Sequence, residues 1–178
     1  MHIMKKLIVI AVLCAAAISI SAVCADAKAD DPVHYRTEGY RGSVSLTNQY
    51  LAWIGVDTSH GYMFDEHHYL GAGAGLFIVP GATPPFAHLF MEYKAYILKK
   101  NSTPVVGFKF GWMGPLNGDA PGNRFSKAAE FEPHAGWAWT FNENLGLNLT
   151  LGLTTFSYPV TGGTAFGFMP KLSIGLEF

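Results

Sequence analysis

The sequence predicts an all-β fold, an eight-stranded antiparallel up-and-down transmembrane β-barrel. Three observations lead to this expectation. From Gly39 onward, apolar residues alternate with small or polar ones in eight runs of about ten to thirteen residues, the period that sends successive strand side chains to opposite faces. The connections between runs are alternately compact and polar, or longer and rich in Gly and Pro. No run shows the three- and four-residue apolar spacing of an amphipathic helix.

The first four predicted strands cover residues 40–48, 51–64, 69–79 and 86–98. In each of them one face is mainly apolar. The opposite faces carry mostly Gly, Ser, Thr and charged residues, together with Phe77, His88, Phe90 and Tyr96. In chain order, the apolar faces are Val44 and Leu46; Ile54, Val56, Tyr62 and Phe64; Leu70, Ala72, Ala74, Leu76 and Ile78; and Leu89, Met91, Tyr93, Ala95 and Ile97.

The last four predicted strands cover residues 105–113, 130–141, 145–155 and 165–178. The run 145–155 alternates most regularly, with Leu at every second position from 145 to 153. The apolar faces are Val106, Phe108, Phe110 and Trp112; Phe131, Ala135, Trp137, Trp139 and Phe141; Leu145, Leu147, Leu149, Leu151 and Leu153; and Phe166, Phe168, Leu172, Ile174, Leu176 and Phe178. The last strand is expected to close the barrel by pairing with the first.

The connections predict a barrel with two different ends. Compact polar turns are expected at 64–68, 98–102 and 141–144, and the other connections at 48–50, 80–85, 114–129 and 158–164. An even strand number puts the compact turns on one side, as in outer-membrane barrels with short periplasmic turns and longer external loops. Strands of about eleven residues, tilted near 40°, rise roughly 28 Å, which matches the apolar band of such barrels.

The N-terminal segment reads as a targeting signal. Lys5 and Lys6 precede an apolar run at 7–20 that is shorter than a membrane-spanning helix, and small residues follow at a cleavage site after Ala25 or Ala27. We therefore expect a signal peptide at 1–25, a short polar periplasmic leader at 26–38 and the barrel at 39–178. Cys14 and Cys24 both lie in the signal, so the mature chain has no disulfide, although Cys24 could instead carry a lipid.

Alternation alone does not say which face points outward. The polar face is too sparsely charged for a solvated exterior, and aromatic residues gather near the strand ends, as they do at membrane interfaces. A broad leucine-rich exterior would also be unfavourable in water. We therefore expect the polar face to fill the lumen, with an interior polar cluster of Arg41, Asp57, Glu92, Lys94, Lys109, Glu130, Glu132, His134, Lys171 and Glu177.

The chain resembles the small outer-membrane β-barrel family of Gram-negative bacteria. The resemblance rests on the signal, the eight alternating runs, Phe-Asn-Glu-Asn-Leu-Gly-Leu-Asn-Leu at 141–149, Gly-Tyr-Arg-Gly at 39–42, Ser-His-Gly-Tyr at 59–62 and the final Leu-Glu-Phe. It implies a porin-like architecture in the cell outer membrane, surrounded by outer-membrane lipid. It also implies that Phe178 is an assembly signal read by the barrel-assembly machinery.

Candidate chemistry is sparse. Asp57 and Ser59 share a strand face, but His60 points the other way, so the three cannot form one catalytic relay. The family's lipid A deacylases use a His-x-Ser pair that this chain lacks. Glu130, Glu132 and His134 could bind a metal, although a salt-bridge cluster with Lys109 or Lys171 is the commoner outcome.

We therefore expect no catalytic residue, no metal and no cofactor. The longest connection offers external-loop binding candidates: Asn117, Asp119, Asn123, Arg124 and Lys127. A near-neutral charge without a basic patch argues against nucleic acid as a partner. The expected protein is a monomeric, non-enzymatic barrel with a structural or surface-recognition role. The alternatives are a periplasmic or secreted lipocalin-like carrier of an apolar ligand and, third, an outer-membrane lipid hydrolase.

Overall fold

The computed structural model describes residues 35–78, 85–116, 128–142, 145–160 and 162–178. The chain divides into two compact units, Met1–Val33 and His34–Phe178, and all described residues belong to the second unit. The predicted signal peptide, most of the predicted leader and the external-loop candidates lie outside the described residues. Within the described part of the chain, no helix is long and apolar enough to span a membrane.

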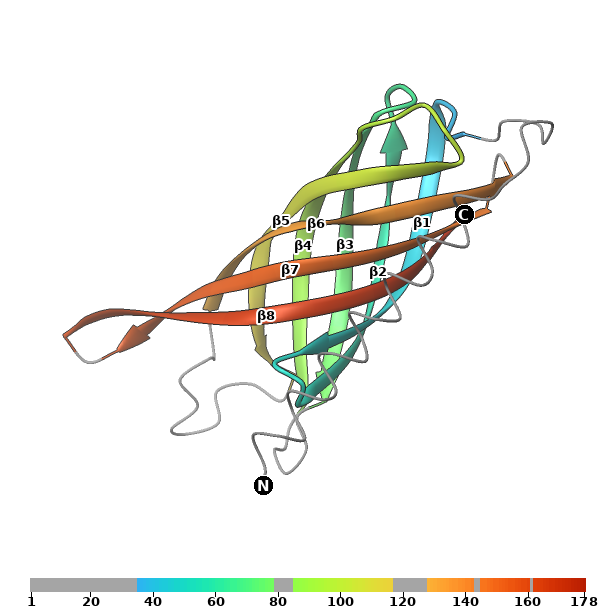
Figure 1. Ribbon diagram of the computed structural model, residues 1–178. Coiled ribbons are helices and arrows are strands. Elements are labelled where there is room, and N and C mark those ends of the chain that lie inside the picture. Colours follow the sequence, from blue (N-terminus) through green and yellow to red (C-terminus); the bar gives the residue numbers. More distant parts are fainter. Residues whose placement is uncertain (1–34, 79–84, 117–127, 143–144, 161) are drawn as a thin grey trace. The chain divides into compact units, whose positions relative to one another are not determined.

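Eight strands form one closed antiparallel barrel in which each strand pairs with its sequence neighbours (Figure 1). The last strand pairs with the first, Ser43 lying opposite Glu177 and Gln49 opposite Lys171. The predicted fold class is therefore confirmed. The strands are β1 (Gly39–Gln49), β2 (Trp53–Met63), β3 (His68–Ile78), β4 (Phe86–Tyr96), β5 (Ser102–Pro115), β6 (Ala128–Asn142), β7 (Leu145–Val160) and β8 (Gly163–Glu177).

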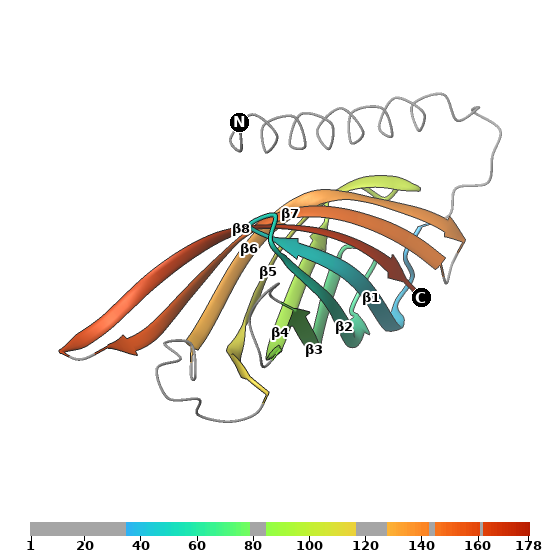
Figure 2. The same cartoon turned by 90° about the horizontal axis from the view of Figure 1, so that it is seen from below.

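One predicted loop is wrong. Residues 158–164 were expected to form a long connection, but β7 and β8 continue as a paired ribbon until Val160 lies opposite Gly163. Gly162 adopts a φ of 91°, which glycine reaches without steric cost and which allows the tight reversal. The end of this hairpin projects past the other strands in both views (Figures 1 and 2).

The connection from β1 to β2 is also tight, but no glycine forms it. Ala52 N donates to Gln49 O at 3.1 Å, closing a four-residue turn. Its two central residues, Tyr50 and Leu51, have φ values of 52° and 57°. Positive φ at both central positions is the geometry of a type I′ hairpin turn, which normally uses Asn and Gly. The turn therefore holds two bulky side chains in a disfavoured backbone region.

The barrel interior is layered between its two ends. At the turn end, where β2 meets β3, β4 meets β5 and β6 meets β7, the buried apolar residues are Met63, Tyr69, Tyr96, Val105 and Ala138. At the opposite, loop end they are Phe77, Phe86, Met113, Ala128 and Phe156, with Trp53 and Met169 packed against them. Charged side chains of the inward faces are buried as well.

Small residues make room for these large interior side chains. A Cβ on Gly55 would lie 2.3 Å from Cδ1 of Phe77, so only glycine fits beside that ring. Trp139 departs from the expected exterior placement, since its side chain is only 6% exposed. The register of β6 against β7 shifts directly after it, between Thr140 and Asn142, which interrupts the simple alternation at that point.

Candidate functional site

The centre of the barrel is an ion-pair network around the Asp57 carboxylate of β2. Lys109 Nζ of β5 lies 2.9 Å and Lys171 Nζ of β8 lies 3.0 Å from Asp57 Oδ2. His88 Nε2 of β4 lies 2.9 Å from the other oxygen, Oδ1. Three strands thus direct donors at one acid, and its exposed fraction is only 2%.

The network extends through β6 and β7 to β1. Lys171 Nζ also lies 2.9 Å from Glu132 Oε2. Thr154 Oγ1 donates to that same oxygen at 3.1 Å, and Gln49 Nε2 donates to Thr154 Oγ1 at 3.0 Å. Lys171 therefore joins a carboxylate of β2 to one of β6, and its own exposed fraction is 1%.

His88 was not among the residues predicted for the interior polar cluster. Its Nδ1 lies 2.8 Å from Glu130 Oε1, while Nε2 faces Asp57. Donating to both carboxylates requires protons on both ring nitrogens, so this geometry fits the imidazolium form. The available sequence signal was its inward position in the alternation of β4, which it shares with Phe90 and Glu92.

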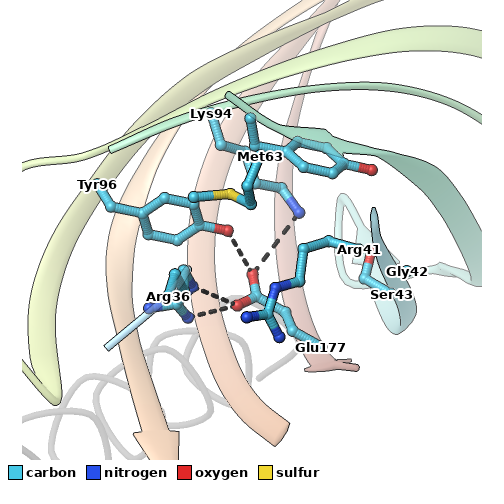
Figure 3. Close-up of a pocket in the computed structure, with 9 residues that line it drawn as sticks. Arg36, Arg41, Gly42, Ser43, Met63, Lys94, Tyr96 and Glu177 are labelled. Carbon is cyan, nitrogen blue, oxygen red and sulfur yellow. Dashed lines mark hydrogen bonds and ion pairs between the residues drawn. The ribbon is translucent and has the colours of Figure 1, made fainter. Parts of the chain in front are cut away.

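A second group of charges gathers at the turn end around Glu177, near the end of β8. Tyr96 Oη and Asn148 Nδ2 each donate to Glu177 Oε1 at 2.8 Å, and Lys94 Nζ lies 3.8 Å from it. Arg36 pairs with the other carboxylate oxygen. Figure 3 shows the Arg36, Lys94 and Tyr96 side chains converging on Glu177. Glu92 links this group to the central network, because its Oε2 lies 3.3 Å from Lys94 Nζ and its Oε1 lies 3.8 Å from Lys109 Nζ.

Arg36 is the residue that sequence reasoning missed most completely. It precedes β1 in the segment predicted as a polar leader, yet its side chain is buried. Its Nη1 donates to Thr140 Oγ1 at 2.9 Å, and its Cζ lies 4.0 Å from the centre of the Tyr96 ring. Burial disfavours its charge, but the nearby Glu177 carboxylate outweighs burial and raises the pKa of Arg36 above its usual value. No periodic pattern marks such a residue.

A small pocket adjoins this group and leaves about 10 Å³ for solvent, roughly the space of one water molecule. Arg41 lines it and is half-buried, with Nη2 donating to Thr37 Oγ1 at 3.5 Å. The pocket is too small for an organic ligand. Its lining residues are Arg36, Arg41, Gly42, Ser43, Met63, Tyr69, Lys94, Tyr96 and Glu177 (Figure 3).

The structure places all other residues of the interior polar cluster inside the barrel. These buried residues are Asp57, Glu92, Lys94, Lys109, Glu130, Glu132, His134, Lys171 and Glu177. Among the described residues, no group of three His, Cys, Asp or Glu side chains is arranged to hold a metal ion. The structure therefore brings these charges together mainly as ion pairs.

The residues considered for a catalytic relay are separated by the barrel wall. Ser59 lies inside and bonds the Tyr69 hydroxyl at 2.8 Å. His60 lies outside, 2.6 Å from the Tyr40 hydroxyl and 3.0 Å from Thr58 Oγ1. Phe178 is exposed, and its backbone exchanges two hydrogen bonds with Gly42 of β1.

Comparisons with known proteins bear on the fold. No family model matches the chain, and no curated protein matches its sequence. Among solved structures, the N-terminal β-barrel domain of OprF from Pseudomonas aeruginosa is similar, with a TM-score of 0.55 and 13% sequence identity. The match covers 82% of this chain and 100% of that domain. This chain therefore shares its barrel fold with the OprF domain, and at this identity the likeness concerns the fold alone.

Proposed function

We propose that this chain is a non-enzymatic outer-membrane β-barrel protein of a Gram-negative bacterium. In this proposal it stabilises the cell envelope or recognises surface partners through the loop end. The observation that carries the proposal is the inverted polarity of the barrel: charged side chains are buried inside, and large apolar side chains cover the outside.

The outward face is apolar on every strand. Exposed side chains include Leu46 of β1, Leu89 of β4, Leu151 of β7 and Ile174 of β8, and Leu151 is 63% exposed. Such a continuous apolar exterior is rare on a protein surrounded by water. Lipid provides the apolar environment in which this surface is favourable.

Aromatic side chains occupy both rims of this surface. Tyr62, Phe64, Phe141 and Phe178 are exposed at the turn end, and Trp112, Phe131, Phe166 and Phe168 are exposed toward the loop end. Two aromatic girdles are characteristic of membrane barrels, because amphipathic rings favour the two interfaces. The fold shared with the OprF domain supports the same environment.

The same proposal names the partners. Outer-membrane lipid surrounds the barrel, the barrel-assembly machinery reads Phe178, and the barrel works as a monomer without nucleic acid or cofactor. A lipocalin-like carrier is not favoured, because the interior is lined with ion pairs and the leucines point outward. A lipid hydrolase lacks support, because Ser59 and His60 lie on opposite faces of β2.

Cell fractionation tests the proposal. The full chain is expressed in a Gram-negative host, and inner membrane, outer membrane and soluble periplasm are separated. We expect the protein in the outer membrane, released by detergent and resistant to urea extraction. Recovery in the soluble periplasm without detergent would overturn the membrane assignment. In the same cells the lipid A mass should stay unchanged, since loss of an acyl chain on expression would instead indicate a hydrolase.

A further inference from the structure

Within the described part of the chain, one edge of β8 has no strand beside it at the loop end. β1 follows β8 only up to the pair of Gln49 with Lys171, after which Tyr50 N donates to Pro170 O at 2.9 Å. On the other side β8 remains paired with β7 as far as Gly163. Residues 163–169 therefore have β7 on one side and no described strand on the other.

The direction of the backbone N–H and C=O groups at this open edge follows from the part of β8 that is paired with β1. Phe178 exchanges hydrogen bonds with Gly42 of β1, and the Pro170 carbonyl also points to the β1 side. Because strand residues alternate in the side to which their N–H and C=O groups point, the even-numbered residues of β8 face that side. Thr164, Phe166 and Phe168 consequently present their N–H and C=O groups to the open edge.

The chemistry of this edge is apolar and uncharged. No Asp, Glu, Lys or Arg occurs between Thr150 and Lys171. Phe166 is 70% and Phe168 is 65% exposed, and the exposed Tyr50 lies where β1 leaves the edge. Natural sheets usually protect an open edge with charges, bulges or proline. Here Pro170 lies only where the pairing of β8 with β1 stops, so it does not protect the open edge.

We propose that the open edge of β8, Thr164 to Phe168, binds an extended, uncharged polypeptide segment as an added strand. An extended backbone can pair with this whole row of donors and acceptors at once, whereas water satisfies each group singly and acyl chains offer no hydrogen-bonding partner. The stretch 163–169 that β1 does not cover has seven residues and spans about 23 Å. Alternate apolar side chains of the bound segment pack beside Phe166 and Phe168 on the outward face.

This inference rests on the proposed recognition role and identifies its partner. Its test uses the full chain folded in detergent micelles, so the result does not depend on where the protein resides in the cell. Fractionation tests the location separately, and the two failures are therefore distinguishable.

The probe is the acetylated and amidated peptide Thr-Val-Thr-Val-Thr-Val-Thr, and the control is the same peptide with N-methylated internal amides. We expect saturable binding of the first peptide and at least tenfold weaker binding of the second, because methylation removes the donors for strand pairing. Equal binding of both peptides would overturn the proposal in favour of simple apolar adhesion.

A matched pair of variants tests the edge itself. Phe166→Pro removes an N–H that faces the open side and leaves the hydrogen bonds to β7 in place. Phe166→Thr removes the ring and keeps the N–H. We expect the proline variant to bind at least tenfold more weakly and the threonine variant to bind within about threefold of the wild type. Equal losses in both variants would assign the binding to the ring and overturn strand pairing.

Hydrogen exchange gives an independent readout that does not require a variant. In the free protein the amides of Phe166 and Phe168 should exchange rapidly, while those of Ala165 and Gly167 are protected by β7. Adding the peptide should protect Phe166 and Phe168. Protection that appears without peptide would overturn the proposal: a second copy is the occupant if it increases with protein concentration, and lipid is the occupant if it increases with added vesicles.

Discussion

Lys171 shows what a buried charge contributes in this barrel. Its ammonium group contacts Asp57 and Glu132 and lies 5.2 Å from the centre of the Phe77 ring. A buried ion pair gains little net stability over apolar packing, because both ions lose their hydration. Removing one partner is different, since the remaining charge stays buried without compensation. The interior network is therefore best tested by single substitutions.

Lys171→Met should leave the buried Glu132 carboxylate without its cation, while Asp57 keeps Lys109 and His88, and should destabilise the barrel by about 3–5 kcal/mol. Urea unfolding in micelles, followed by tryptophan fluorescence, measures this change. Lys99→Met is the matched control, because Lys99 pairs with Glu66 at 2.5 Å in an exposed position. We expect only a small effect there. Similar losses in the two variants would contradict the role assigned to burial.

Asp65, in the turn between β2 and β3, gives a prediction about pH. Its carboxylate accepts the backbone N–H groups of His67 and His68, both at 2.7 Å. These bonds, led by the one from His67, lower the pKa of Asp65 below that of an unperturbed aspartate. The resulting stabilisation is present above about pH 4 and is lost as pH falls through the lowered pKa.

NMR titration should therefore place the Asp65 midpoint below that of an unperturbed aspartate. In Asp65→Ala, the His67 and His68 amides should exchange faster at neutral pH. Their exchange protection should also no longer change over the pH range in which Asp65 titrates. Asp65→Asn keeps an acceptor oxygen without the charge, so partial protection is expected. An unshifted Asp65 midpoint would show that these bonds do not form in solution.

Among the elements, β8 carries the clearest test of the membrane orientation. Ile174 faces outward opposite Leu46 of β1, midway along the β1–β8 pairing. Ile174→Arg should destabilise the barrel in vesicles by about 2–4 kcal/mol if this level is the bilayer midplane. Thr164→Arg is the control, because Thr164 has the same parity on β8 but lies beyond the end of β1. A negligible effect at position 174 would contradict a lipid-facing surface.

The turn between β1 and β2 should respond to a substitution that relieves its backbone. Tyr50→Asn combined with Leu51→Gly supplies the residues that a type I′ turn favours. We expect a gain of about 1 kcal/mol in the free energy of unfolding, since left-handed conformations cost ordinary residues on the order of 1–2 kcal/mol. Leu46→Gly, in the regular part of β1, should destabilise instead. A loss in the double variant would show that Tyr50 and Leu51 stabilise the turn through their side chains.

Strand positions and, apart from Trp139, the strand faces discussed above followed from the alternation, because a period of two directly gives the side to which each side chain points. The ends of the strands were harder to predict from the sequence. The predicted loop at 158–164 contains Pro159 and two glycines, which suggested a long connection, yet β7 and β8 stay paired up to Val160 and Gly163. Local composition marks a turn without fixing how many flanking residues remain paired.

Most ion pairs within the interior could not be predicted, although a salt bridge between Glu132 and Lys171 was among those expected. Parity places Asp57, Lys109 and Lys171 inside, but their convergence depends on the stagger and radius of the closed barrel. His88 bridges two acids for the same reason. Arg36 lies before the first strand, where no period applies, and only the closed barrel brings it beside Glu177.

For the whole molecule, the layered interior predicts the absence of a conducting path. Buried apolar side chains lie at both ends, and between them ion pairs cross the interior, such as Lys109 of β5 with Asp57 of β2. An eight-stranded barrel has room for its own side chains and little more. Planar-bilayer recordings should therefore show no large stable conductance, with a wide general porin as the positive control. A persistent open channel would contradict a filled interior.

The short pairing between β1 and β8 also bears on the lifetime of the closed barrel. These strands pair only from Ser43–Glu177 to Gln49–Lys171, whereas β7 and β8 pair from Gly146–Glu177 to Val160–Gly163. Separating β1 from β8 therefore breaks the fewest backbone hydrogen bonds. Arg36, which precedes β1, spans this pairing because its side chain binds Glu177 of β8 and Thr140 of β6. If these Arg36 contacts form after the folding transition state, they slow unfolding and leave the folding rate unchanged. The residue that sequence reasoning overlooked would then determine how long the barrel stays closed.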